Sequence, residues 1–302
     1  MKQVCIFIVS LTLSFPSVAL DIKPDDVYTQ VYLIKEEIET LKQHFHVQKD
    51  AEAFELKTKL TPRHTWQKSY EVAYKINILR EKLGLPVFAS PSIEPRRKII
   101  PLYIYEETQR ILVELRIIKL FLGIEQNKVQ ALPTFSGKEP TDVFNLFNHI
   151  SYDLDLLNGV AFTPSNVFSQ AIRIFEDIDI ILSTLEVVDN TIPPPKKEEV
   201  KPTNVFETAL ELLQEVQRIQ RLGNLELIDI HALRPDKEIT PSEVFSLLGT
   251  ILAELQTVKA YLGLAWALTP MAKHYEDKAP RDVQQVLGWA LRRTKLVNTL
   301  NR

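Results

Sequence analysis

Apolar side chains recur along the chain at alternating steps of three and four residues. In one stretch they run from Val27 through Val31, Ile34 and Ile38 to Leu41. The same spacing recurs over 104–122 and 244–262. Such steps place side chains on one face of an α-helix, whereas a strand would show strict alternation. The pattern therefore predicts amphipathic helices that pack through one apolar stripe.

Proline marks the predicted start of each helix. The prolines concerned stand at positions 24, 62, 101, 140, 164, 202, 241 and 280. Proline is favoured at the first helical position because its missing N–H would have no partner there. The residue before proline can cap the helix, and the candidate caps are Thr61, Thr163 and Thr240. Glu243 completes a capping box with Thr240. Acidic residues at the third helical position favour the positive helix end, and these are Asp26, Asp142 and Asp282. We interpret the recurring proline phrase as a helix start signal and not as a binding motif.

Glycine marks several predicted helix ends. A helix often ends at a left-handed residue, and glycine adopts that conformation without steric cost. The candidates are Gly84, Gly123, Gly223 and Gly263. Start and stop signals together predict eight helices of about 20 to 22 residues each.

The chain is a tandem duplication. Each of the first four prolines is followed 140 residues later by one of the last four. The intervening positions match as well, as in Ile111-Leu112-Val113-Glu114-Leu115 against Ile251-Leu252-Ala253-Glu254-Leu255. We therefore predict an all-α fold made of two four-helix units, covering residues 20–160 and 161–302, with a bundle-like or solenoid-like arrangement.

The predicted linkers are long and partly extended. They greatly exceed the usual connection of about four to six residues, and Pro193-Pro194-Pro195 excludes a helix in one of them. The stretch 49–60 is a candidate for a short extra helix. An extended linker is long enough to return along its helix, which would leave successive helices parallel; the parallel and antiparallel alternatives both remain open. The connection between the units, 159–163, is short.

The first 19 residues have the pattern of a secretory signal peptide. Lys2 precedes an apolar run from Val4 to Phe15, and small residues end at Ala19, where we expect cleavage. The run is too short to span a bilayer, and no later stretch is apolar enough. The single cysteine, Cys5, falls inside this segment. A mature chain without cysteine or glycosylation acceptors favours a bacterial periplasmic or secreted protein.

Recognisable catalytic chemistry is missing from the sequence. We find no phosphate-binding loop, nucleophile elbow or zinc-binding signature, so no catalytic, cofactor or metal residue is assigned. His44 and His46 diverge on a helix and favour a solvated helix end over a metal site. Glu176 and Asp179 lie opposite the apolar stripe, which favours a solvated face over an acid–base pair. A net charge of -3 predicts no general attraction to nucleic acid.

Two pairs of residues are retained in both units. These are Glu114 with Glu254 and Lys119 with Lys259. Within each unit the Glu and the Lys are five residues apart, so they do not face each other on one helix. We therefore expect them to pair between neighbouring helices, or alternatively to line a groove between the units.

The three tryptophans divide by position. Trp66 and Trp289 are expected in the core, because they fall on predicted helices. Trp266 falls in a linker, where an exposed aromatic ring is a candidate contact for a partner.

These observations favour an exported, non-enzymatic helical repeat protein that binds a protein partner or a cell-envelope component. The alternative is a periplasmic sensor or carrier that holds a small ligand between helices or between the units. An enzyme whose catalytic residues are scattered along the chain is the least favoured class.

Overall fold

The computed structural model describes residues 21–49, 53–87, 98–125, 133–159 and 162–300, and within them it is all-helical. The helices are α1 (Pro24–His44), α2 (Pro62–Lys82), α3 (Pro101–Phe121), α4 (Pro140–Asn158), α5 (Pro164–Thr184), α6 (Pro202–Leu222), α7 (Pro241–Tyr261) and α8 (Pro280–Thr294). A short 3₁₀ helix, η1 (His231–Leu233), lies between α6 and α7. The predicted signal peptide and its cleavage site lie outside the described residues.

Every one of these eight α-helices begins at its predicted proline. The third helical residue accepts a hydrogen bond from the backbone N–H before the proline, at 2.8 Å for Asp26, Asp142 and Asp282. Glu243 does the same for Thr240 at 2.8 Å, which confirms that capping box. Thr61 is the N-cap of α2, as predicted, and His64 completes a capping box, because its Nδ1 accepts the Thr61 backbone N–H at 3.2 Å.

The helix ends agree less closely with the sequence signals. Six helices have 21 residues, but α4 has 19 and α8 only 15, below the predicted length. Gly84, Gly123 and Gly263 have positive φ, as expected. Gly223 does not; Asn224, at the position equivalent to Gly84, takes the left-handed conformation instead. Glycine is retained at 223 because a Cβ atom there would lie 3.0 Å from the Leu300 side chain.

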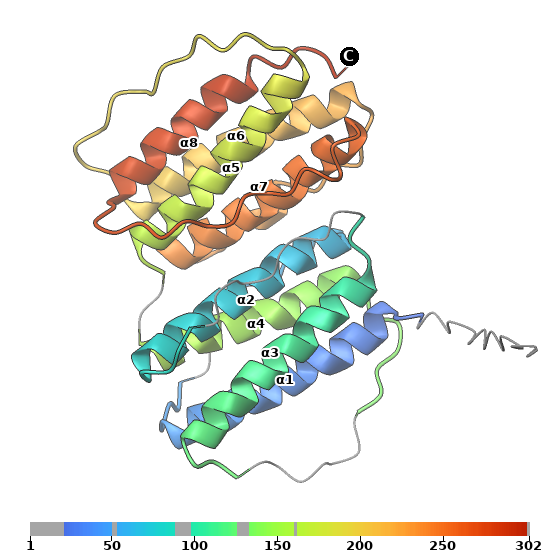
Figure 1. Ribbon diagram of the computed structural model, residues 1–302, viewed down its shortest axis with the longest axis vertical. Helices are drawn as coiled ribbons and strands as arrows, with labels where there is room; N and C mark the ends of the chain where they lie inside the picture. The colour runs from blue at the N-terminus through green and yellow to red at the C-terminus, as the bar shows by residue number, and fades with distance from the viewer. Residues whose placement is uncertain (1–20, 50–52, 88–97, 126–132, 160–161, 301–302) are drawn as a thin grey trace, which may run out of the picture.

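The helices form two four-helix bundles, unit 1 (α1–α4) and unit 2 (α5–α8), stacked along the long axis of the molecule (Figure 1). Around unit 1 the neighbouring helices are α1, α3, α2 and α4 in turn, and the order in unit 2 is equivalent. The four initiating residues Pro24, Pro62, Pro101 and Pro140 line one hollow at a single end of unit 1. Unit 2 repeats this. The helices within each unit are therefore parallel.

Parallel helices explain the length of the linkers, because each linker must return the chain from one end of a bundle to the other. The α1–α2 linker crosses α4, where the Leu56 backbone N–H donates to Asn145 at 2.9 Å. The equivalent α5–α6 linker crosses α8, where Gln285 donates to the Pro194 carbonyl oxygen at 2.8 Å. No helix forms in the described part of 49–60, so the extra helix expected there is not supported.

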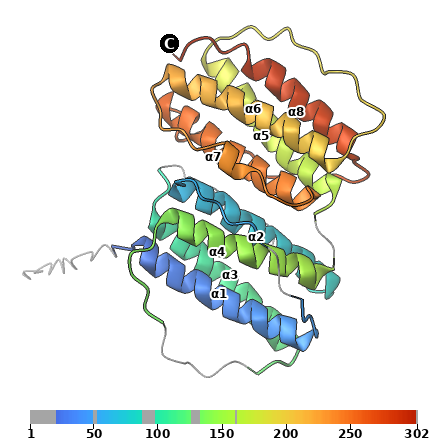
Figure 2. The same ribbon diagram turned by 180° about the vertical axis from the view of Figure 1, so that it is seen from behind.

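The core has one part in each unit. The stripe from Val27 to Leu41 is fully buried in unit 1, and unit 2 buries an equivalent set around α7. The larger cluster also includes Leu60, Tyr70 and Phe144 of unit 1, so it continues across the junction of the units. Figure 2 shows the same junction from behind, with α2 and α4 below α7.

Candidate functional site

The two units meet through α7, which lies against α2. Lys68 donates to the Ser246 hydroxyl at 2.7 Å, and Arg63 donates to the Thr257 hydroxyl at 2.5 Å. Residue numbers thus rise along α2 as they fall along α7, so the two helices run antiparallel. The helix dipoles of the two units therefore oppose each other, which offsets part of the cost of four parallel dipoles within each unit.

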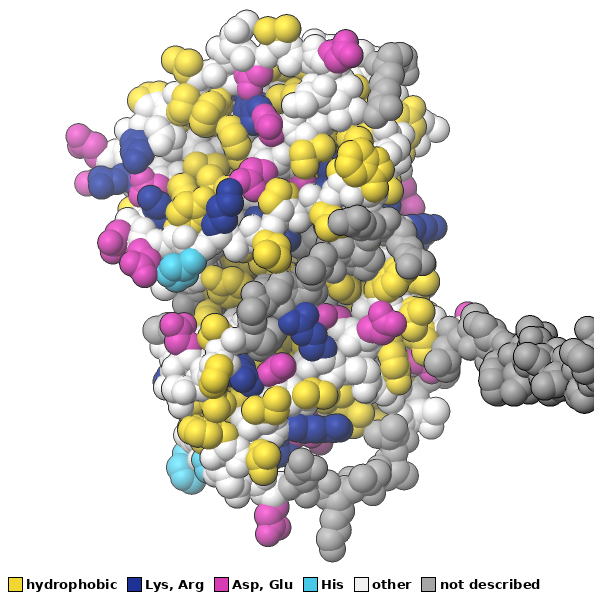
Figure 3. Space-filling model, viewed as in Figure 1, with side chains coloured by type: hydrophobic (Ala, Val, Ile, Leu, Met, Phe, Trp, Pro, Cys, Tyr) yellow, Lys and Arg dark blue, Asp and Glu magenta, His cyan; other side chains and the backbone are white. Residues whose placement is uncertain are grey.

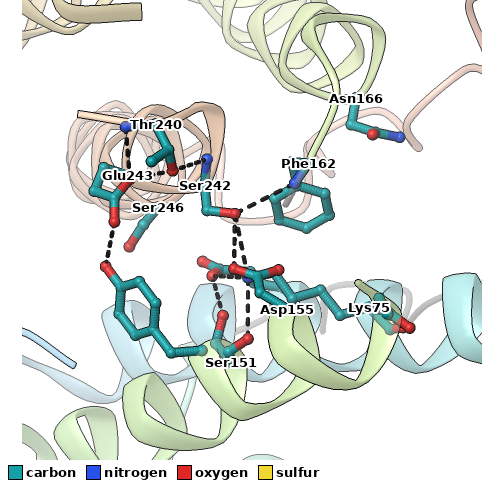
Figure 4. A network of polar contacts seen from close by, with 12 residues as sticks. Lys75, Ser151, Asp155, Phe162, Asn166, Thr240, Ser242, Glu243 and Ser246 are labelled. Carbon is teal, nitrogen blue, oxygen red and sulfur yellow. Dashed lines mark hydrogen bonds and ion pairs between the residues drawn. The ribbon is translucent and has the colours of Figure 1, made fainter. Parts of the chain in front are cut away.

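A charged cluster fills the centre of this inter-unit interface, the contact of α2 and α4 with α7 (Figure 4). Lys75 contacts Asp155 at 2.7 Å and Glu71 at 3.7 Å. The Ser242 hydroxyl, in the first turn of α7, donates to Asp155 at 2.9 Å. Lys68 pairs with Glu71 at 2.8 Å. Two buried amines therefore face two carboxylates, and this balance is what makes buried charges tolerable.

Glu243 ties the start of α7 to α4. Its carboxylate accepts hydrogen bonds from the Tyr152 hydroxyl at 2.8 Å and contacts Lys237 at 3.0 Å. Burial alone would raise the pKa of Glu243, but hydrogen bonds from Thr240, Lys237 and Tyr152 hold it below its usual value. Burial, together with the neighbouring charge of Glu243, raises the pKa of Tyr152. The phenol and the carboxylate therefore keep one donor and one acceptor role near neutral pH.

Burial also displaces the titration of the central cluster. It lowers the pKa of Lys68, although Glu71 opposes this effect, and it raises the pKa of Asp155, although Lys75 opposes that. An amine of lowered pKa beside a hydroxyl has the geometry of a base next to a nucleophile. The ion pair with Glu71 favours the protonated amine, so the arrangement is better suited to hold α7 in register.

A small hollow of ≈ 40 Å³ opens beside the interface. Phe144 of α4, Phe206 of α6 and Leu233 of η1 form apolar walls, whereas Tyr152 and Glu243 form a polar wall. The hollow therefore combines apolar surface with a few converging polar groups, but its volume is far below the roughly 300–1,000 Å³ of ordinary ligand pockets.

The equivalent face of unit 2 lies between α6 and α8, and none of the described helices covers it. It forms a hollow of ≈ 250 Å³ that is open to solvent, the α6–α8 groove. The α5–α6 linker forms one wall, and a Cβ atom on Gly288 of α8 would lie 3.1 Å from the Pro194 ring. Four basic side chains surround one acidic residue, Glu211, and these are Lys197, Arg281, Arg292 and Lys295.

Sequence changes between the units explain why one face is filled and the other open. Tyr152 and Asp155, which hold the start of α7 on unit 1, correspond to Arg292 and Lys295 on unit 2. The Tyr152 hydroxyl and the Asp155 carboxylate, which hydrogen-bond the first turn of α7, are thus replaced by cations in unit 2. The α6–α8 groove keeps the position of a helix-binding face but not its chemistry.

The pairing expected for the retained residues of unit 1 is confirmed. Lys119 of α3 contacts Glu37 of α1 at 2.6 Å, and Glu114 of α3 contacts Arg80 of α2 at 2.7 Å. Both contacts join neighbouring helices within one bundle. They hold the bundle together and line no groove between the units.

Their counterparts in unit 2 divide between the two expectations. Lys259 is fully buried and pairs with Asp177 at 2.7 Å, in the equivalent of the Lys119 position. Glu254 instead approaches His64 of unit 1 at 3.0 Å and accepts a hydrogen bond from Gln220 at 2.7 Å. Glu254 is therefore part of the inter-unit interface.

The tryptophans follow the expected division in two of three cases. Trp66 is buried in the core of unit 1. Trp266 is 66 % exposed, as expected for a linker position. Trp289 is only half-buried rather than in the core; it contacts Phe175 and donates to the Thr191 hydroxyl at 3.0 Å, under the α5–α6 linker.

Within the described part of the chain, no group of three or more His, Cys, Asp or Glu side chains could hold a metal ion. His44 and His46 are exposed at the end of α1, as expected. Glu176 contacts Lys273 at 2.9 Å and Asp179 contacts Arg293, so this acidic pair is engaged by separate cations. An acid–base pair is therefore not formed there.

Sequence reasoning missed the charged residues of α2. Lys68, Glu71 and Lys75 carry no motif, and the partners that Lys68 and Lys75 find on α7 and α4, Ser246 and Asp155, lie far away along the chain. The available signal was the duplication itself: Lys68 and Lys75 correspond to Thr208 and Glu215, so neither cation is retained in the other unit. Loss of a charge between duplicated units marks a position whose surroundings differ.

Comparisons with protein-family models, with curated proteins and with solved structures gave no match. Among the residues placed in the structure, no helix combines the length and apolar character needed to cross a membrane. The functional argument therefore depends on the geometry of the chain alone.

Proposed function

We propose that this chain is an exported, non-enzymatic binding module, and that the α6–α8 groove is where it binds a protein partner. One observation carries the proposal: the equivalent face of unit 1 already binds a helix, α7, through α2 and α4. A duplicated face that remains open is a ready site for another protein segment. A cell-envelope component other than protein is the alternative occupant.

Photo-crosslinking in the source cells tests this proposal. Benzoylphenylalanine replaces Gln284, which lines the groove, and Gln214, which is exposed on α6 outside it, serves as the matched control. We expect a protein adduct at position 284 that is absent at 214 and weakens at least tenfold with Thr208→Trp, which adds bulk to the groove lining. Equal adducts at both positions, or none at 284, would contradict the proposal.

Export is part of the same proposal and rests on the pattern of residues 1–19. We propose a periplasmic or secreted location after cleavage near Ala19. N-terminal sequencing of the exported fraction should begin at or close to Leu20. An intact Met1 in that fraction would contradict it.

The hollow beside the inter-unit interface supports a second candidate function, a small-ligand carrier or sensor. It joins aromatic walls to the Tyr152–Glu243 pair within ≈ 40 Å³, so it suits only a ligand of a few atoms that carries one polar group. A thermal-shift screen against small ligands should then raise Tm for the wild type but not for Phe144→Trp, which fills the hollow. Lack of any stabilising compound would remove this candidate.

A further inference from the structure

The internal contact leaves two surfaces of the molecule without a partner. It uses the third helix of unit 2, α7, and the α2–α4 face of unit 1. Duplication supplies each surface twice. The third helix of unit 1, α3, and the α6–α8 groove of unit 2 therefore remain, and they are equivalent to two surfaces that bind each other inside the chain.

The outer face of α3 carries an apolar stripe. Val113, Ile117 and Leu120 are spaced by four and three residues, and their exposures are 51 %, 39 % and 74 %. Phe121 beside them is 57 % exposed. Figure 3 shows hydrophobic side chains on the surface of unit 1 in the view in which α3 faces the reader. Aligned apolar side chains on one helix face are a common mark of a protein contact.

The α3 surface and the α6–α8 groove differ in side-chain size from their counterparts in the internal contact. On α7, Ser246 and Ala253 are small, and α3 has Glu106 and Val113 at those positions. The α3 surface is therefore the larger.

At two positions the side chains of the α6–α8 groove are smaller than those of the α2–α4 face. Lys68 and Asn148 of unit 1 correspond to Thr208 and Gly288 of unit 2. A bulkier helix therefore faces a groove that is roomier at these two positions.

We propose that α3 of one molecule binds in the α6–α8 groove of a second copy, antiparallel to α6 as α7 is to α2. The inference rests on the proposed function and names its partner. The contact joins two different surfaces, so it is heterologous, and repeated copies form an open chain unless the rotation closes a ring.

Charge distinguishes this partner from an acidic protein segment. The α3 stripe carries one acid, Glu106, and one base, Arg116, so it is neutral. Arg292 and Lys295 occupy the positions at which Tyr152 and Asp155 contact α7, so they lie beside the bound α3, whose neutral face offers them no net opposite charge. Association is then held by apolar contact. Salt should therefore change self-association less than twofold between about 0.05 and 0.5 M, whereas an acidic segment would be released.

Sedimentation of the purified chain over a concentration series provides the first test. We expect the mass to rise in multiples of one chain. Val113→Glu should weaken association at least tenfold with an unchanged circular dichroism spectrum. Val188→Glu, at a linker valine that is 77 % exposed, is the matched control and should leave it unchanged.

Disulfide formation between two single-cysteine variants provides the second test. The Ser242 hydroxyl and the Asp155 carboxylate lie 2.9 Å apart in the internal contact. The residues at the equivalent positions of the other unit are Leu102 and Lys295. Mixing Leu102→Cys with Lys295→Cys should give a covalent dimer that neither variant gives alone. A dimer of Leu102→Cys with itself would overturn the proposal, because it would indicate a symmetric contact.

The outcomes separate this inference from the proposed function. A chain that stays monomeric while the groove crosslinks to a different protein overturns the second-copy partner and leaves the binding module standing. A monomer with no adduct in the groove overturns both.

Discussion

The α2–α4 face and the α6–α8 groove occupy the same position in two copies of one bundle, yet one is buried and the other is open. The buried face carries balanced charges, with Lys75 between Asp155 and Glu71. The open groove has Lys295 where the buried face has Asp155. A few side chains thus decide whether a duplicated surface becomes an internal contact or a site for another molecule.

The same comparison shows how the α6–α8 groove differs from the face that binds a third helix inside the chain. A contact of this type propagates only while each new face accepts the next third helix. The polar and basic lining of the α6–α8 groove no longer matches α7 itself, whose Ser242 needs the carboxylate of Asp155. The open groove therefore offers a different chemistry from the face that binds α7.

Removing one buried charge should produce the largest difference between the two faces. Lys75→Ala leaves Asp155 and Glu71 without their shared amine, so we expect the free energy of unfolding to fall by about 3–5 kcal/mol. Glu215→Ala, at the equivalent position, loses a partly exposed contact with Arg218 and should cost at most about 1 kcal/mol. Urea denaturation of both variants checks this, and equal losses would refute the distinction.

Bulk on α7 provides the next test. A Cβ atom on Gly249 would sit 3.5 Å from the Gln67 Cβ atom, so Gly249→Ala should be tolerated. Gly249→Gln introduces the residue that α3 has at this position and should cost about 1–3 kcal/mol by forcing the units apart. The reciprocal Gln109→Ala, on the exposed stripe, should stay within about 0.5 kcal/mol. Thermal melts of the three variants decide, and an unaffected Gly249→Gln would show that the interface is loosely packed.

The helices were predictable because their signals are local. Proline at the first position marks each start, a side chain at the third position completes a capping box in all but α3, and all eight starts agree with the structure. Helix ends depend on neighbours that are distant in sequence. Gly223 is explained by its closeness to Leu300 rather than by left-handed geometry.

The partners of the charged residues were not predictable from spacing alone. Glu114 and Lys119 keep the same spacing in both units, but this spacing does not identify their partners. Lys119 contacts α1 and Glu114 contacts α2, because the order of helices around the bundle decides the pairing. The open groove could be predicted only once the helices were known to be parallel, and the sequence left that arrangement undecided. With the helices parallel, Lys295 occupies in unit 2 the position at which Asp155 contacts α7 in unit 1.

Acid should weaken the buried interface through Glu243. The pKa of this carboxyl is lowered in the folded chain, so its contribution is complete above the ordinary pKa of glutamate and is lost as pH falls below it. Glu243→Gln should cost about 1 kcal/mol at pH 7 and reduce the slope of stability against pH on the acid side. Denaturation at pH 7 and pH 4 measures both quantities. An unchanged slope would assign the acid sensitivity to other groups.

The smallest expected effect on stability lies in the open groove. Gly288→Asn restores the residue of unit 1 but places side-chain atoms against Pro194, where even a Cβ atom would approach to 3.1 Å. The gain in helix propensity, at most about 1 kcal/mol, offsets this crowding, so the unfolding free energy should change little. The α5–α6 linker should nevertheless shift outward, and trypsin should cut faster after Lys196 and Lys197. Gly288→Ala should give an intermediate rate, because it adds only the Cβ atom. Unchanged proteolysis in both variants would mean that the linker is held by Gln285 and Arg292 and does not depend on the glycine, so that the groove wall tolerates a larger occupant than the structure suggests.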